Sequence, residues 1–501
     1  MKSFIPILVL SLALAATTKA ELKLPAFFSD HMVLQAGVKT PIWGTASPNE
    51  KVTVTLAGVP VTTTAGADGK WRVELPPQKE GLNTDLTLDA SGAQTIIHDV
   101  LWGEVWLCSG QSNMVRILPL TDNAEQVIAA ANDPKIRMFT VERAAAIEPQ
   151  NDLKGTWRLA TPENAKTFSG VAYYFGKKVR EVTGNPVGLI VSAYGGTYIE
   201  CWLDEKTMEA DPATKILQDR WNKHVVDLPS ELEKYEADMK IWTPEAEKAK
   251  AAGQTPPRKP WHPLPADYPL SLNKLYNAMI HPLLGYGIRG FLWYQGETNA
   301  TGNPNAEYGI AFAGLIKSWR NYWGNDQLPF YFVQLPNYEP PQKQYWPDMR
   351  ETQRRTLSIP KTGMAITIDV GDPGDVHPKN KKDVGERLAR IALANEYGQK
   401  IESSGPLIRT AKFSNGKTQL EFDHANGLKT TNGQPPLNFE VGDGTGAFKP
   451  ATAAIVNNAI VLECAEISAP KFVRYAWVPN PTVNLVNGDG LPAAPFKIDI
   501  P

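Results

Sequence analysis

A serine lies at the apex of a turn that directly follows an apolar, strand-like run. The run Val105–Cys108 leads into the sequence SGQSNM at residues 109–114, with Ser112 at the turn. A serine hydroxyl becomes a nucleophile when a neighbouring base takes its proton, and a strand-to-helix turn presents backbone N–H groups that can hold an oxyanion. The alternative interpretation is an ordinary polar turn, because serine is common in turns for structural reasons. Ser112 is therefore a candidate nucleophile whose assignment depends on finding a base.

The chain offers few bases for such a serine. Five histidines fall in segments that we expect to be flanking β domains or an insertion, namely His31, His98, His224, His262 and His424. His281 fits either the base or a satisfied core histidine. His377 follows the apolar run 364–369 and is the favoured base, with a turn histidine bonded to backbone as the alternative.

Composition excludes several classes of partner and cofactor. With 51 basic and 53 acidic residues, the chain has no general electrostatic reason to bind nucleic acid or an anionic membrane surface. The histidines are scattered, no paired Cys-x-x-Cys occurs, and Asp369, Asp372 and Asp375 indicate a calcium loop only weakly. No phosphate-binding glycine fingerprint follows a strand. We therefore expect no metal and no cofactor, and a neutral or weakly charged small molecule or glycan as ligand.

The first twenty residues have the pattern of a secretory signal. Lys2 precedes an apolar run from Phe4 to Ala16, and the segment ends at Thr18-Lys19-Ala20. This pattern predicts cleavage near Ala20 and a secreted or periplasmic protein without a membrane anchor. The oligomeric state has no signal in the sequence.

Patterning divides the remaining chain into three parts. Residues 21–100 alternate apolar and polar positions in short runs, which predicts a small antiparallel β domain. Residues 101–397 alternate apolar strands with helical stretches, which predicts an α/β core with a mainly parallel sheet. Residues 398–501 return to strands and turns and predict a β-sandwich-like domain. The proposed site residues follow strand ends, the edge at which open α/β sheets bind ligands.

The α/β part of the chain contains an insertion, and the whole chain contains three cysteines. Residues 203–269 are rich in Glu, Lys and Ala and then in Pro, which predicts helices on a solvated face followed by an extended connector. The insertion begins shortly after a glycine turn, so it either leans over the pocket or decorates the surface. Cys108, Cys201 and Cys464 allow at most one disulfide; Cys108 with Cys201 is the favoured pair, but buried free thiols are the stronger expectation.

Four sequence blocks resemble the sialate O-acetylesterase-like branch of the SGNH (GDSL-type) hydrolases. They are SGQSNM at 109–114, SAYGGT at 192–197, WYQGETN at 293–299 and DVHP at 375–378. The blocks fall in that family's order, and the resemblance covers nearly the whole chain after residue 21. It implies an SGNH-like three-layer α/β core flanked by two antiparallel β domains.

The resemblance places the family's catalytic histidine at His377. In the wider group an aspartate stands three positions before that histidine, but here the position is Gly374. Asp375 is nearest in sequence. Glu297 is the rival, because related carbohydrate acetylesterases use the glutamate of a Gln-Gly-Glu turn, and Asp372 is the third choice. A Ser–His pair with weak carboxylate support also stays open, since the acid chiefly orients the imidazole.

The same resemblance implies an oxyanion hole and the residues around it. The backbone N–H of Ser112 is joined by a glycine N–H from Gly195 or Gly196 and by a side-chain amide, for which this chain offers Gln295. The substrate-binding candidates are three further amides, which are as compatible with stabilising turns. They are Gln111, Asn113 and Asn299.

The resulting hypothesis is a secreted carbohydrate O-acetylesterase acting through an acetyl-enzyme on O-acetylated sialic acid or a related glycan. One alternative is a glycan-binding protein without catalysis. The other is an SGNH lipid esterase or thioesterase, which the two β domains make less attractive.

Overall fold

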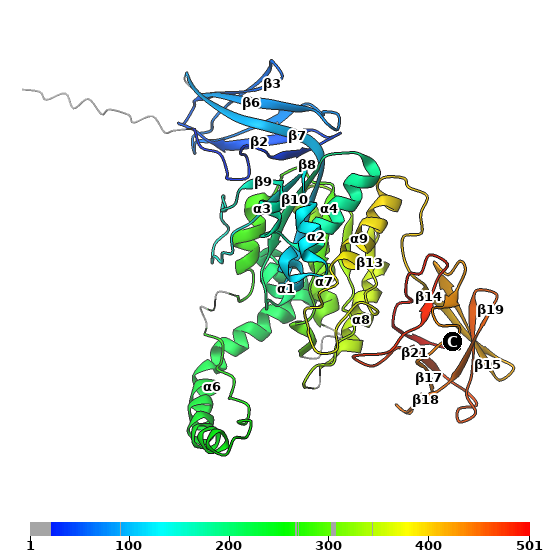
Figure 1. Cartoon of the computed structure of the whole chain (residues 1–501). Helices are drawn as coiled ribbons and strands as arrows, with labels where there is room; N and C mark the ends of the chain where they lie inside the picture. Colours follow the sequence, from blue (N-terminus) through cyan, green and yellow to red (C-terminus); the bar gives the residue numbers. More distant parts are fainter. Residues whose placement is uncertain (1–21, 91, 266–267, 269, 302–306, 343) are drawn as a thin grey trace, which may run out of the picture.

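The computed structural model describes residues 22–90, 92–265, 268, 270–301, 307–342 and 344–501. The expected signal segment, residues 1–20, lies outside the described residues. Figure 1 shows an α/β body with one β unit at its N-terminal end and another at its C-terminal end. No helix in these described ranges is long and apolar enough to cross a membrane.

The N-terminal unit shares a strand with the body. Antiparallel strands β3 (Lys51–Leu56), β4 (Val59–Thr64) and β6 (Asn83–Ala90) pair in one sheet, to which the first half of β7 (Ala93–Gly110) adds. The second half of β7 is buried on both faces and lies inside the body. One continuous strand of 18 residues crosses the boundary expected near residue 100, where the partner of β7 changes from β6 to β10 and β11.

The body is built on a sheet with β7 at its centre. Its strands, in spatial order, are β13 (Thr362–Ala365), β12 (Phe330–Val333), β11 (Gly290–Tyr294), β7, β10 (Val187–Ala193), β8 (Asp133–Thr140) and β9 (Trp157–Ala160). All neighbours on this path are parallel except β8 and β9. The mainly parallel sheet expected from the strand–helix alternation is confirmed.

Helices cover both faces of this sheet, as buried parallel strands require. Trp106 of β7 packs against Phe175 of α4 (Gly170–Thr183). Phe291 of β11 is paired with Leu107, the next residue along β7, so it points to the opposite face. There it packs against Trp319 of α7 (Glu307–Tyr322). Successive side chains of β7 point to opposite faces, so α4 lies on one face of the sheet and α7 lies on the other.

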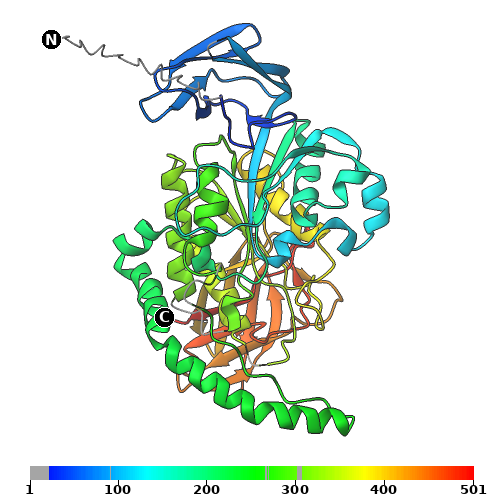
Figure 2. The ribbon, with the colours of Figure 1, turned by 90° about the vertical axis from the view of Figure 1, so that its left-hand side faces the viewer.

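The insertion forms α5 (Glu205–Ala210) and the long helix α6 (Pro212–Ala251). Only Thr214, Leu217 and Ala246 of α6 are buried, and ion pairs at i,i+4 such as Lys223–Asp227 line its surface. The expected solvated helices are therefore present. In Figure 2 this green helix curves along one side of the molecule, and its far end extends beyond the body.

The C-terminal unit contains two four-stranded antiparallel sheets around a separate apolar core. One sheet has the order β14 (Leu407–Ser414), β15 (Lys417–Asp423), β20 (Ala459–Glu463) and β19 (Thr452–Val456). The other has the order β18 (Phe448–Pro450), β17 (Phe439–Gly442), β21 (Phe472–Tyr475) and β23 (Phe496–Asp499). This arrangement agrees with the sandwich-like pattern read from the sequence.

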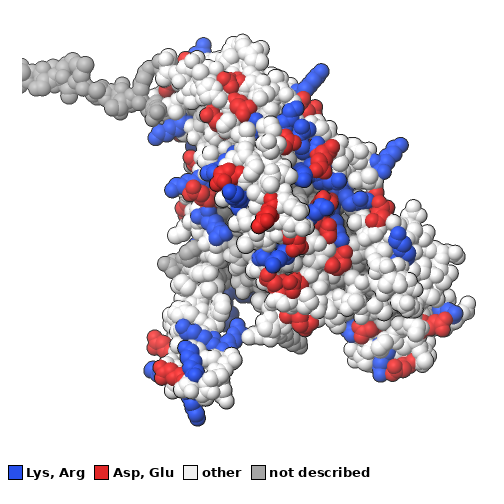
Figure 3. Space-filling view, viewed as in Figure 1, with Lys and Arg blue, Asp and Glu red and all other residues white. Residues whose placement is uncertain are grey.

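The charged surface agrees with the near balance of basic and acidic residues in the sequence. On the face shown in Figure 3, basic and acidic side chains are interspersed.

The three cysteines are free thiols, and burial raises the pKa values of Cys108 and Cys201 well above the usual value for cysteine. The expected free thiols are confirmed, although Cys464 is only partly buried. Within the described part of the chain, no group of three His, Cys, Asp or Glu side chains is arranged to hold a metal ion.

Candidate active site

The nucleophile turn is fixed by close packing between β7 and β11. Gly110 ends β7 with φ of 134°, and a Cβ there would overlap the carbonyl oxygen of Tyr294 in β11. The next N–H, that of Gln111, donates to the same carbonyl at 2.9 Å. Ser112 then begins the short helix α1 (Ser112–Val115), so its own N–H lacks an intrahelical acceptor. Glycine at position 110 is therefore a requirement of this turn.

The fold brings Ser112 and His377 together. The imidazole Nε2 lies 2.8 Å from the Ser112 Oγ, although the residues are 265 positions apart. His377 lies in the loop between β13 and α9 (Lys382–Asn395). This distance is within the range at which a general base accepts a serine proton. His281 lies elsewhere, with its Nδ1 2.8 Å from the carbonyl of Gln150.

His377 is held as a neutral base. Burial lowers its pKa below the usual value for histidine, and the cations Arg116 and Lys381 lower it further. The carboxylate of Asp375 opposes these effects. A neutral imidazole at neutral pH has a free lone pair for the Ser112 proton.

Of the three candidate carboxylates, Asp375 lies closest to the imidazole. Its Oδ1 is 3.6 Å from His377 Nδ1 and accepts the backbone N–H of His377 at 2.8 Å. Asp372 instead accepts the N–H of Gly374. Glu297 is buried and accepts a 2.5 Å hydrogen bond from Asn113 Nδ2. At 3.6 Å the contact between Asp375 and His377 is longer than a hydrogen bond, and it becomes an ion pair only when the imidazole is protonated.

The Gly195 turn lies against the serine, whereas the Gln295 amide binds other groups. A Cβ on Gly195 would lie 3.3 Å from the Ser112 Cβ, so this turn contacts the nucleophile, and Gly196 follows it with φ of 72°. Gln295 is fully buried, and its Nε2 donates to Thr197 O at 3.0 Å and to Asn299 Oδ1 at 2.7 Å. The expectation that Gln295 donates to the oxyanion is corrected, because neighbouring acceptors take both amide hydrogens.

The three amides expected to contact substrate bind protein groups instead. Gln111 Oε1 accepts the N–H groups of Gly296 and Thr298, both at 3.4 Å. Asn113 is fully buried. Asn299 Oδ1 accepts the N–H of Ile199, and its Nδ2 donates to Glu200. These contacts favour the alternative interpretation, in which the amides hold the turns in place.

The site contains a buried lysine that the sequence pattern did not reveal. Lys381 has no exposed surface, and its Nζ donates to Asn113 Oδ1 at 2.6 Å. Its ammonium also lies 5.5 Å from the centre of the Tyr294 ring. Burial lowers the pKa of Lys381 to about 7. Nothing in the charged run 379–382, Lys-Asn-Lys-Lys, marks one of its lysines as buried.

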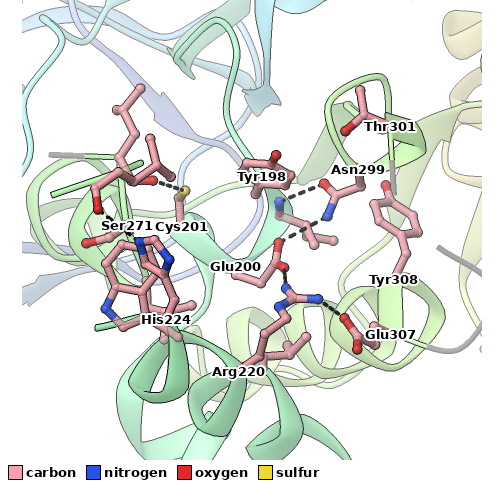
Figure 4. A pocket seen from close by; sticks show the side chains of 16 residues that line it. Tyr198, Glu200, Cys201, Arg220, His224, Ser271, Asn299, Thr301, Glu307 and Tyr308 are labelled. Carbon is pink, nitrogen blue, oxygen red and sulfur yellow. Dashed lines mark hydrogen bonds and ion pairs between the residues drawn. The ribbon is translucent and has the colours of Figure 1, made fainter. Parts of the chain in front are cut away.

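A pocket of about 500 Å³ opens between the insertion and the turns of the site (Figure 4). Tyr198 and Glu200 come from the segment that follows Gly196, and Trp221 and His224 come from α6. Arg220 of α6 pairs with the buried Glu200 and with Glu307. The insertion therefore forms one wall of a pocket, whose lining includes neither Ser112 nor His377.

Comparison with known proteins gives consistent matches. The model of a family described as carbohydrate esterase, sialic acid-specific acetylesterase, matches residues 102–224 and 249–394. A sialate O-acetylesterase from Mus musculus is 31% identical over 447 residues, which cover 79% of this chain and 78% of the relative. The sialate O-acetylesterase from Homo sapiens is 29% identical over 445 residues, which cover 80% and 76%.

A solved structure is also similar along almost the whole chain. It is the crystal structure of a novel carbohydrate acetylesterase from Xanthomonas citri, with a TM-score of 0.81 and 35% sequence identity. The match covers 96% of this chain and 100% of that chain. The part left between the two matched segments of the family model, residues 225–248, lies within α6.

Proposed function

The chain belongs to the sialic acid-specific acetylesterase family of carbohydrate esterases, and on this premise we propose that it hydrolyses O-acetyl esters of sialic acid or a related glycan with Ser112 as nucleophile. Membership makes it an esterase; the nucleophile and the mechanism are our inference. The observation that carries the proposal is the 2.8 Å contact between Ser112 Oγ and His377 Nε2.

In the proposed mechanism, His377 removes the hydroxyl proton as Ser112 attacks the acetyl carbonyl. The N–H groups of Ser112 and Gly195 are the donors that we assign to the resulting oxyanion. His377 then gives its proton to the sugar oxygen as the bond between this oxygen and the acetyl carbon breaks, which releases the sugar and leaves an acetyl-enzyme. Water activated by the same imidazole releases acetate and restores the serine.

We assign Asp375 as the carboxylate that supports His377. Asp375→Asn should lower kcat by about 10- to 100-fold, less than for a fully buried triad acid, because the 3.6 Å contact is long and partly exposed. Because Asp375 raises the pKa of His377, its neutralisation should also move the acid limb of the kcat/KM profile to lower pH. A pH profile of aryl acetate hydrolysis measures both effects.

Glu297→Gln and Asp372→Asn are the matched controls for Asp375→Asn. Both remove one carboxylate charge, and neither should move the acid limb as far. A larger loss of kcat in Glu297→Gln, with the limb displaced to lower pH, would transfer the role to Glu297.

The pocket between the insertion and the core is the proposed site for the glycan beyond the acetylated ring. Its wall contains the Trp221 indole, whose ring centre lies 5.2 Å from that of His224. Flat aromatic faces suit sugar rings because they bury apolar C–H surface without demanding a fixed hydrogen bond. The pocket volume of about 500 Å³ lies within the usual range for small-molecule sites.

Trp221→Ala should raise the KM for an acetylated oligosaccharide about tenfold, which corresponds to a loss of about 1.4 kcal/mol of binding. The KM for an aryl acetate should not change, because this small substrate does not reach the pocket. Trp261→Ala is the control, since Trp261 lies in the same insertion but is 74% exposed and outside the pocket lining. Equal effects of the two substitutions would argue against the glycan pocket.

A screen of acetate release tests the function and narrows the substrate. Acetylated sialosides, acetylated xylan and an aryl acetate are given to the purified protein, with Ser112→Ala as the control. We expect release that prefers acetyl to longer acyl chains and that disappears in the control. Preference for long acyl chains would favour a lipid esterase, and no release from any ester would favour a glycan-binding protein.

The remaining assignments concern the fold and the first twenty residues. We propose that the α/β body is an SGNH-type hydrolase core, flanked by β units near residues 21–100 and 398–501. We also propose that residues 1–20 direct secretion or export to the periplasm and are removed. N-terminal sequencing of the exported protein tests the cleavage site near Ala20.

A further inference from the structure

A buried chain of three side chains lies beside the nucleophile. Asn113 stands at its centre, with the Glu297 carboxylate on its Nδ2 and the Lys381 ammonium on its Oδ1. All three side chains are almost completely inaccessible to solvent. Buried charges are costly unless they are paired and hydrogen-bonded, so a chain of this kind persists only where its neighbours hold it in place.

The Asn113 amide connects the segments that carry the nucleophile and the base. Its Nδ2 also donates to the carbonyl of Val376 at 3.0 Å. Asn113 directly follows Ser112, and Val376 directly precedes His377. One amide therefore sets the spacing between the serine turn and the histidine loop.

The charges at both ends determine which way this amide points. As an ammonium, Lys381 supplies only donors, so it requires the amide oxygen. The Val376 carbonyl supplies only an acceptor, so it requires the amide nitrogen. Glu297 accepts from the same nitrogen, although burial raises the pKa of its carboxyl group. A flipped amide would face repulsion at all three contacts, and the Lys381 charge is what holds its oxygen side.

Lys381 also acts on His377 through its charge. The charged groups that face Lys381 are Glu297, Arg116, Asp375 and Asp122. Those that face His377 are Asp375, Arg116 and Lys381 itself. The pKa of Lys381 is about 7 and that of His377 lies below its usual value, so the ammonium is protonated where the imidazole titrates. It therefore disfavours the imidazolium throughout that range.

We propose that Lys381 is a positioning residue of the esterase site, which orients the Asn113 amide between the serine turn and the histidine loop and acts on His377 through its charge. The inference rests on the proposed function of Ser112 and His377. It assigns Glu297 to the support of Asn113 and Lys381, which explains why this carboxylate does not contact the imidazole.

Lys381→Met tests the inference in the full-length protein. We expect kcat to fall about 10- to 100-fold with little change in KM, because ground-state contacts with substrate are untouched. Loss of the cation should raise the pKa of His377 and move the acid limb of kcat/KM to higher pH, opposite to the shift expected for Asp375→Asn. Lys382→Met removes the same charge from the next, exposed residue and should change neither quantity.

A double variant shows whether Lys381 positions the Asn113 amide or only neutralises the Glu297 charge. It also provides a test if the single variant does not fold. Lys381→Met with Glu297→Gln leaves no unpaired charge in the interior, so it should fold. If Lys381 only neutralises Glu297, the double variant regains the kcat and acid limb of the unmodified protein, and the inference is overturned. If Lys381 positions the amide, kcat stays low and the limb stays displaced.

Titration of His377 followed by NMR tests the inference without measuring esterase activity. The His377 resonance, assigned by its loss in His377→Gln, should titrate at higher pH in Lys381→Met and in the double variant than in the unmodified protein. An unshifted resonance overturns the inference even if the protein is an active esterase. Conversely, a shifted resonance in a protein that hydrolyses no ester supports the role of Lys381 toward His377 while rejecting the proposed function.

Discussion

Ser112→Ala should lower kcat for acetyl ester hydrolysis by at least about a thousandfold, and His377→Ala should do nearly the same. Each substitution removes one partner of the 2.8 Å contact, and the members of such a unit fail together. The doubly substituted protein should therefore be little worse than either single variant. Initial rates with an aryl acetate and with the best acetylated glycan measure the loss.

Two substitutions of the same kind serve as controls for this prediction. Ser109→Ala changes a buried serine of β7 whose Oγ has no hydrogen-bond partner among the described residues, so it should leave kcat within about twofold. His281→Ala removes the histidine that lies on the Gln150 carbonyl. Retained activity in Ser112→Ala, or loss of activity in His281→Ala with none in His377→Ala, would contradict the assignment.

Arg350→Met should lower the free energy of unfolding by about 3–5 kcal/mol, because it leaves several carbonyl groups without their charged donor. Arg350 belongs to α8 (Trp346–Arg355) and is completely buried. Its guanidinium donates to four carbonyls, those of Leu335, Pro336, Val478 and Pro479. Methionine fills much of the volume of the arginine side chain but leaves all four carbonyls without this donor.

The Arg350 contacts join the body to the C-terminal unit, so the effect should be visible as a change in cooperativity. Urea unfolding followed by circular dichroism and tryptophan fluorescence should show an earlier first transition in Arg350→Met. Arg409→Met, which removes a 54% exposed arginine from β14, should change the midpoint very little. A loss below about 1 kcal/mol in Arg350→Met would mean that water replaces the guanidinium at these carbonyls.

Patterns that depend on near neighbours were readable in the sequence. Fully apolar runs such as Gly290–Tyr294 and Val187–Ser192 form central strands because a buried parallel strand needs apolar side chains on both faces. The strand before Ser112 made this serine a candidate, and the four family-like sequence blocks selected it together with His377. The continuity of β7 across the boundary near residue 100 was not readable, because the strand's neighbours change there from the N-terminal sheet to the body.

The contacts of individual polar groups, by contrast, were decided by the tertiary structure. The sequence determined that this chain carries a serine turn, a histidine loop and an α/β sheet to present them, because strand propensity and turn chemistry act over a few residues. Only the fold decided that Gln295 gives its amide hydrogens to Thr197 and Asn299, that Asp375 lies nearest the imidazole and that Lys381 is buried against Asn113. The physical reason is that a hydrogen bond depends on positions within a few tenths of an ångström between residues up to 268 places apart, a relation that local sequence does not encode.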